Sequence, residues 1–210
     1  LRHRFTALER AQEQGIGHYF VPRYTRVVDT ADSKDDINKA YSLISTSKVR
    51  NEMIISDVKK SIELNQTPVI LTRFKEHAKL LYDALKNEAD HVFLLYGDNS
   101  DKENAEIRVK LKQVPKTESL ILIATGQKIG EGFDFPRLDT LIMATPVSFR
   151  GVVEQYAGRL NRDYEGKKNV IVYDYVDSHI PMFDNMYAKR LKAATRRFFR
   201  FIPTASLLFR

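Results

Sequence analysis

The sequence predicts an α/β fold: a three-layer sandwich with a mostly parallel central sheet and a basic helical extension at the C-terminus. Three observations lead to this prediction. Short, continuously apolar runs recur along the chain, stretches with apolar residues at helical spacing separate them, and basic residues gather at the end. Continuously apolar strands between helices are typical of a parallel sheet that helices cover on both faces.

The first expected helix begins after Ser47, which is a plausible N-cap residue. Ile55, Val58 and Ile62 recur at helical spacing and form an apolar stripe. Asn65 is expected to end this helix, because asparagine tolerates the left-handed conformation in which many helices terminate.

From residue 69 onward, strands and helices alternate. Strands are expected at 69–72, 92–96, 120–124, 140–144 and 170–173, and helices at 75–87, 102–114 and 152–160. This pattern places a globular domain at residues 49–178 and a basic helical extension at residues 179–210. Residues 1–48 lack a sustained pattern, although 19–21 and 26–28 could form short strands, and we expect them to be a linker or the tail of a preceding domain.

The net charge of +7 has a local origin. Lysine and arginine number 34, and aspartate and glutamate number 27. The stretch from Tyr187 to Arg210 holds seven basic residues and no acidic one, so the rest of the chain is balanced. Leu191, Ala194 and Phe198 lie at helical spacing in this tail. Its charges either stay in water while the helix packs on the sheet, or contact phosphates and add a salt-dependent affinity.

Composition excludes several classes of protein and site. The chain has no cysteine, which excludes disulfides and thiolate metal sites and fits a reducing compartment such as the cytoplasm. The five histidines show no ligand spacing, so we predict no metal site. No apolar run approaches the ~20 residues that span a bilayer, so we expect no membrane partner. The chain opens on Leu1, and we expect it to be cut from something longer.

The loop after the third apolar run, residues 125–134, has the composition of a nucleotide-binding loop. It holds three glycines, a threonine, a lysine and two carboxylates. Glycines let backbone N–H groups approach an anion closely, and a carboxylate can accept hydrogen bonds from ribose hydroxyls. The same glycines would equally suit a tight connection between strands, and spacing alone does not separate the two interpretations.

A pair of arginines follows on the short helix. Residues 155–162 read Gln-Tyr-Ala-Gly-Arg-Leu-Asn-Arg, which places Arg159 and Arg162 three positions apart and on one helical face. Two guanidinium groups on one face can hold a triphosphate through bidentate bonds. The alternative is an ordinary solvated pair of arginines.

Taken in order, these segments resemble the second RecA-like domain of superfamily 2 helicases and translocases, the DEAD/DEAH type. The resemblance covers roughly residues 49–177. Three motifs carry it: the strand Val69-Ile-Leu-Thr72-Arg73, then Ala124-Thr125 with Gly132-Phe133-Asp134 after a short spacer, then Q-x-x-G-R-x-x-R from Gln155 to Arg162. The stretches 131–139 and 173–177 are also similar to helicase subunits of restriction-like defence and conflict systems.

The resemblance implies an ATP site shared with another domain. Arg159 and Arg162 look like arginine fingers, which stabilise the charge that develops on the γ-phosphate during phosphoryl transfer. Gln155 is similar to the residue on the phosphate side of the cleft. Asp134, together with Gly132, looks like the group that contacts the ribose.

The resemblance also implies contacts with a nucleic-acid backbone. Thr125 and the strand-end residues Thr72 and Arg73 resemble the residues that make these contacts. Lys128 is either a further phosphate contact or a solvated lysine.

A motor of this family needs two RecA-like lobes. The first supplies a G-x-x-x-x-G-K-[ST] phosphate loop and a D-E-x-[DH] box for Mg²⁺, and neither motif occurs in this chain. The resemblance therefore implies the second motor lobe of an ATP-dependent helicase, acting on DNA or RNA, with residues 1–48 as the tail of the missing N-terminal lobe or the linker from it.

ATP and Mg²⁺ would belong to the complete protein, and we expect this chain alone to bind neither and to hydrolyse no ATP. The alternative function is a non-catalytic, helicase-like module that binds nucleic acid or another protein.

Overall fold

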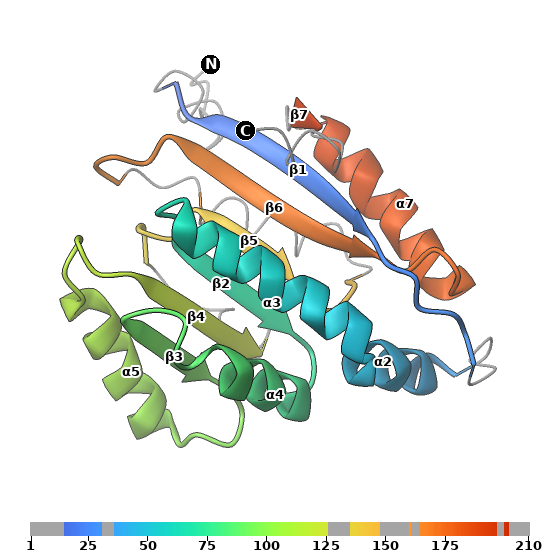
Figure 1. The fold of residues 1–210 in the computed structure, drawn as a ribbon, viewed down its shortest axis with the longest axis horizontal. Helices are drawn as coiled ribbons and strands as arrows, with labels where there is room; N and C mark the ends of the chain where they lie inside the picture. Colours follow the sequence, from blue (N-terminus) through green and yellow to red (C-terminus); the bar gives the residue numbers. More distant parts are fainter. Residues whose placement is uncertain are drawn as a thin grey trace, which may run out of the picture.

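The computed structural model describes residues 15–30, 36–125, 135–147, 160, 164–196 and 200–201. These residues form a sheet of seven strands, all parallel, in the order β3-β4-β2-β5-β6-β1-β7 (Figure 1). The strands are β1 (Gly17–Tyr24), β2 (Pro68–Thr72), β3 (His91–Leu95), β4 (Leu120–Thr125), β5 (Thr140–Met143), β6 (Asn169–Val176) and β7 (Arg200–Phe201). The helices are α2 (Ile37–Thr46), α3 (Lys48–Glu63), α4 (Lys75–Leu85), α5 (Asp101–Gln113) and α7 (Pro181–Arg196).

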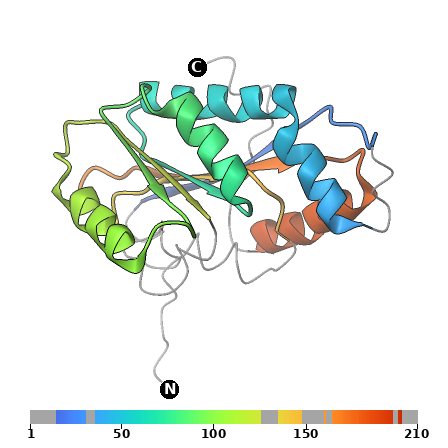
Figure 2. The ribbon, with the colours of Figure 1, turned by 90° about the horizontal axis from the view of Figure 1, so that it is seen from below.

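Helices cover both faces of the sheet and give the molecule three layers (Figure 2). The helices α3 and α4 lie on one face, and α5 and α7 lie on the other. Successive side chains of a strand point to opposite faces, so a strand covered on both sides is apolar throughout. In β4, Ile121 and Ile123 pack toward α3 and α4, whereas Leu120 and Leu122 pack toward α5 and α7. The predicted α/β sandwich is confirmed.

The strands predicted from residue 69 onward are all present as β2 to β6, and the predicted helices 75–87 and 102–114 correspond to α4 and α5. The end of α3 also follows the prediction. Asn65 adopts a φ of 57° and donates its backbone N–H to the carbonyl of Ile62 at 2.9 Å. The helix expected at 152–160 lies outside the described residues except for Leu160, which is helical.

The sheet begins earlier in the chain than the sequence indicates. β1 pairs with β6 along its whole length, from Gly17 opposite Asn169 to Tyr24 opposite Val176, and lies between β6 and β7. Residues 17–24 thus belong to the sheet rather than to a linker that ends at residue 48. Pro22, which interrupts the apolar pattern, lies beyond the two residues that pair with β7, where a missing N–H is tolerated.

The helix α2 has no counterpart among the predicted elements. It begins after Asp36, whose carboxylate accepts hydrogen bonds from the backbone N–H groups of Asn38 at 2.9 Å and Lys39 at 3.2 Å. Its Tyr41 packs against Phe183 of α7, with 4.9 Å between the ring centroids. This contact joins α2 to the C-terminal helix, which lies far from it in the sequence.

The basic C-terminal helix packs on the sheet. α7 buries Phe183, Tyr187 and Ala194 against the body of the protein. Arg190, one of the basic residues of the tail, is 1% exposed and forms an ion pair with Asp174 of β6 at 2.8 Å. The helix therefore packs on the sheet as the first interpretation of the tail has it, but the Arg190 charge is buried rather than in water, which removes it from those that could reach a phosphate.

Candidate functional site

The carboxyl ends of parallel strands meet at one edge of a sheet, and ligands of such sheets bind there. Thr72 at the end of β2 stands opposite Thr125 at the end of β4 in the strand ladder. Arg73 follows Thr72, so three of the four predicted nucleic-acid contacts lie together at this edge. The other predicted site residues lie outside the described residues: Lys128, Gly132, Asp134, Gln155, Arg159 and Arg162.

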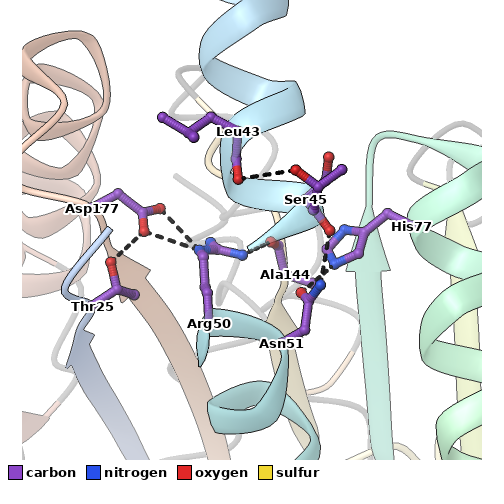
Figure 3. A network of polar contacts seen from close by, with 9 residues as sticks. Thr25, Leu43, Ser45, Arg50, Asn51, His77, Ala144 and Asp177 are labelled. Carbon is purple, nitrogen blue, oxygen red and sulfur yellow. Dashed lines mark hydrogen bonds and ion pairs between the residues drawn. The ribbon is translucent and has the colours of Figure 1, made fainter. Parts of the chain in front are cut away.

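Thr72 is the first member of a buried chain of hydrogen bonds. It is 2% exposed, and its hydroxyl lies 2.8 Å from Nδ1 of His77. The Nε2 of His77 lies 2.9 Å from Oδ1 of Asn51 (Figure 3). The Asn51 amide nitrogen donates to the carbonyl of Ser45 at 2.8 Å, which turns its oxygen toward the histidine. His77 therefore carries its proton on Nε2, and the Thr72 hydroxyl donates to Nδ1.

This arrangement bears on the predicted role of Thr72. A hydroxyl has one proton to donate, and a phosphate oxygen can only accept. With its proton engaged by His77, the Thr72 hydroxyl would have to break that bond before it could donate to a nucleic-acid backbone. Arg73, which is exposed, is the better placed of the two side chains for such a contact.

The buried histidine makes stability depend on pH. Burial, helped by the charge of Arg50, lowers the pKa of His77 from 6.5 to about 3. Between these values the unfolded chain binds a proton that the folded chain does not, so the folded state loses stability as the pH falls below 6.5. We expect His77→Gln to lose less stability than the parent on acidification, by up to about 1.4 kcal/mol per pH unit.

Urea unfolding at pH steps from about 7 to about 5 measures this difference. His179→Gln, at an exposed histidine, is the matched control and should follow the parent. If the free energy of unfolding falls equally with pH in His77→Gln and in the parent, His77 titrates in the folded protein near its ordinary pKa.

Arg73 rests on a buried ring. Its guanidinium carbon lies 5.0 Å from the centroid of the Tyr41 ring, and Tyr41 itself is 3% exposed. The Tyr41 hydroxyl donates to the carbonyl of Pro146 at 2.9 Å, just after β5. The stacking holds an exposed arginine at the strand edge while leaving it accessible to a ligand.

Residues 144–147, which we call the post-β5 segment, are held by a fully buried arginine. Arg50 donates from one terminal nitrogen to the carbonyl of Ala144 at 2.7 Å, and from Nε to Asp177 at 3.0 Å (Figure 3). Thr25 donates its hydroxyl to the same carboxylate at 2.5 Å. This network links α3 to the ends of β1, β5 and β6.

A second buried arginine holds the same segment from the opposite face of the sheet. Arg190 of α7 donates from Nε to Asp174 at 2.8 Å and from a terminal nitrogen to the carbonyl of Val147 at 3.0 Å. Backbone carbonyls of the post-β5 segment thus accept hydrogen bonds from side chains of α2, α3 and α7. The segment leads directly toward the Q-x-x-G-R-x-x-R motif in the sequence.

Sequence reasoning missed these two ion pairs. One signal was present: Asp174 interrupts the apolar run of β6, and a carboxylate inside such a strand is rarely buried without a partner. Arg50 and Arg190 gave no signal, because a buried arginine occupies the same helical spacing as a solvated one.

Leu160 is the one described residue of the Q-x-x-G-R-x-x-R motif, and it is held at the other edge of the sheet. It accepts a hydrogen bond at its carbonyl from Nζ of Lys167 at 2.8 Å. Lys167 comes just before β6, so it lies at the amino end of that strand. Leu160, the residue next to Arg159, is thus tied to the opposite edge of the sheet from Thr72 and Arg73.

The described residues offer neither a metal site nor a membrane-spanning helix. No group of three or more histidine, cysteine, aspartate or glutamate residues among them could hold a metal ion. The helices described are also too short or too polar to cross a membrane.

No family model matches the chain. It is 24% identical over 165 residues to transcript termination protein A18 of myxoma virus (strain Lausanne), which covers 74% of this chain and 34% of the viral protein. It is 30% identical over 167 residues to putative helicase 161L of Invertebrate iridescent virus 6, which covers 77% of this chain and 36% of that protein. The chain therefore spans about a third of the length of these curated relatives.

Solved structures share the fold at low sequence identity. UvsW of T4 superposes with a TM-score of 0.71 and 18% identity over 90% of this chain and 41% of UvsW. The C-terminal domain of the DEAD-box protein Dbp5 superposes with a TM-score of 0.56 and 14% identity, over 91% of this chain and 92% of that domain. S. cerevisiae Dbp5 bound to RNA and ADP BeF3 superposes with a TM-score of 0.58 and 14% identity, over 97% of this chain and 45% of the Dbp5 chain.

Proposed function

We propose that this chain, whose fold is that of the C-terminal RecA-like domain of helicases, is the second motor lobe of an ATP-dependent nucleic-acid helicase or translocase. One observation carries the proposal. The two strands that lead into its first two motifs, β2 and β4, are neighbours in a sheet of this fold, with Thr72 opposite Thr125 at their carboxyl ends.

In this function the lobe completes an ATP site that another lobe begins. The first lobe holds the phosphates and Mg²⁺, which neutralises part of their charge. This chain supplies Arg159 and Arg162 to the γ-phosphate, Gln155 to the phosphate side, and Gly132 and Asp134 to the ribose. Such a division fits a sequence that carries the second-lobe motifs and no phosphate-loop motif.

The nucleic-acid contacts are proposed for the carboxyl edge of the sheet. Thr72, Arg73 and Thr125 lie there, and Lys128 follows Thr125 in the sequence. A contact with the sugar–phosphate backbone carries no base information, so it serves DNA and RNA alike. Dbp5, which shares the fold, has been solved with RNA bound. The kinship of this chain to helicases of restriction systems stays a prediction from sequence.

We expect Arg73→Ala to weaken nucleic-acid binding and to flatten its salt dependence. Each phosphate contact that is lost reduces the slope of log K against log salt by about 0.9 on B-DNA or about 0.7 on single strands. Fluorescence anisotropy with a labelled oligonucleotide at several salt concentrations measures the slope. Lys110→Ala removes one exposed charge from α5 and is the matched control. An unchanged slope for Arg73→Ala would place the phosphate contact elsewhere.

A non-catalytic nucleic-acid-binding or interaction module is the second candidate. Both functions use the carboxyl-edge residues, but only a motor lobe needs Arg159, Arg162 and Asp134. ATP turnover in a protein that carries both lobes separates them, because only the motor function loses turnover when the two arginines are replaced.

A further inference from the structure

Lys167 makes an unusual set of contacts for a lysine near a surface turn. Its ammonium group donates to the carbonyl of Leu138 at 2.8 Å, to that of Leu160 at 2.8 Å, and to that of Pro136. An ammonium has three N–H donors, so one side chain binds three backbone acceptors. The three acceptors come from two segments that lie more than twenty residues apart in the sequence.

A tight turn places Lys167 for this role. Its backbone N–H donates to the carbonyl of Tyr164 at 3.0 Å, which closes the turn. Gly166, the third residue of the turn, has a φ of 86° in the left-handed region, where a side chain would strain the backbone. The turn delivers Lys167 to the amino end of β6, next to the amino end of β5.

One of the two segments is anchored independently of Lys167. In the turn at residues 135–139, Arg137 donates to the carbonyls of Pro115 at 2.9 Å and Glu118, just after α5. Asp139 accepts at its carboxylate from the backbone N–H of Thr67 at 2.9 Å, just before β2. The turn is thus tied to its neighbours on two sides and forms a fixed base.

Both segments that Lys167 contacts lie next to proposed site residues in the sequence. Leu160 follows Arg159, one of the two proposed arginine fingers. Pro136 comes two residues after Asp134, the proposed ribose contact. We propose that Lys167 is a positioning residue: through its bonds to Leu160, Pro136 and Leu138 it ties the neighbour of Arg159 to the turn at residues 135–139.

The role follows from how catalysis by fixed charges works. A guanidinium stabilises the transition state only where it is already in place, and a displacement of about 1 Å can cost about 10²-fold in rate. Lys167 itself touches no substrate in this arrangement, because its partners are backbone carbonyls. This positioning role rests on the proposed function, but the tether itself does not.

Hydrogen exchange in this 210-residue chain tests the tether without ATP. Lys167→Met keeps an unbranched side chain and removes the donors. We expect several-fold faster exchange in a peptide covering residues 155–162, with peptides from β2 and α4 unchanged. Lys168→Met, at the exposed neighbour, is the matched control and should leave all peptides unchanged. Lys167→Arg, which keeps the charge and the donors, should restore slow exchange in part.

Unaltered exchange of residues 155–162 in Lys167→Met would overturn the tether. If Lys167→Met unfolds the chain, so that every peptide exchanges, Lys167→Gln repeats the test with a shorter side chain that keeps one donor group. Hydrogen exchange of residues 155–162 in Lys167→Gln then decides whether the tether exists.

Steady-state ATP turnover in a protein with both lobes tests the positioning role. We expect Lys167→Met to lower kcat by about 10²-fold with a smaller change in KM, and Lys167→Arg to recover part of the loss. If Arg159→Ala abolishes turnover while Lys167→Met leaves kcat unchanged, the positioning role is wrong and the proposed function stands. If Arg159→Ala also leaves turnover unchanged, the proposed function itself fails.

Discussion

We expect replacement of Arg159 or Arg162 by alanine to lower nucleic-acid-stimulated ATP turnover by about 10³-fold or more in a protein that carries both proposed motor lobes. Negative charge spreads over the equatorial oxygens of the γ-phosphoryl group as it is transferred, and a fixed guanidinium stabilises that charge. The effect should fall mainly on kcat, because the interaction is strongest in the transition state. Phosphate release from ATP, with and without an oligonucleotide, measures it.

Two comparison variants sharpen this experiment. Arg159→Lys keeps the positive charge but loses the planar fork, so it should recover only part of the activity. Arg26→Ala removes an exposed arginine from outside the motif and should behave as the parent. Full turnover in both Arg159→Ala and Arg162→Ala would show that the finger roles are wrong.

Replacement of Arg50 by alanine lowers the free energy of unfolding by about 3–5 kcal/mol. The loss arises because the carboxylate of Asp177 is fully buried and, among the described residues, the Thr25 hydroxyl is the side-chain partner that stays. The carbonyl of Ala144 loses its buried donor at the same time. The net stability of a globular domain is about 5–15 kcal/mol, so a loss of this size is a large share of the total.

Urea unfolding of the parent and the variant measures this loss. Lys48→Ala, in the same first turn of α3, is the matched control. Lys48 forms an ion pair with Glu52 at 3.9 Å with its side chain 90% exposed, and its loss should not measurably change stability. A loss for Arg50→Ala no larger than that of the control would contradict the role of the buried pair.

A double substitution measures what the Arg50–Asp177 ion pair itself contributes to the free energy of unfolding. One terminal nitrogen of Arg50 has no hydrogen-bond partner among the described residues, so its charge is incompletely satisfied. Buried pairs of this kind are often no more stable than well-packed apolar residues. Arg50→Met combined with Asp177→Asn should therefore recover part of the stability that Arg50→Ala loses, because no lone charge stays buried.

The central strands were predictable because their apolar composition reflects their burial on both faces. A strand such as β4 is covered on both faces, so all its side chains must be apolar, and a run of this kind is rare in segments that face water. β1 was harder to predict, since Gly17 and Pro22 interrupt its pattern and its pairing with β6 joins residues more than a hundred positions apart. α2 was missed because its apolar face is completed by residues distant in sequence, among them Phe74 and Phe183.

The candidate site, like the fold, was predictable from the sequence only in part. The resemblance of the ordered motifs to a second helicase lobe made Arg73, Arg159 and Asp134 candidates, since spacing alone left other interpretations open. Sequence could not show that Thr72 already donates its proton to His77, since that bond depends on a helix packed against the strand. It also could not show that the buried Arg190 belongs to the core rather than to a basic tail.

The sequence by itself determined that this protein is a parallel α/β domain with the motifs of a second helicase lobe, because local composition and spacing record burial and chemistry. The tertiary structure alone decided which charges are structural. Arg50 and Arg190 fix the post-β5 segment from two faces of the sheet, and Lys167 joins Leu160 to the turn at residues 135–139 through backbone carbonyls. Backbone acceptors have no signature in sequence, so contacts of this kind become visible only when distant segments are brought together.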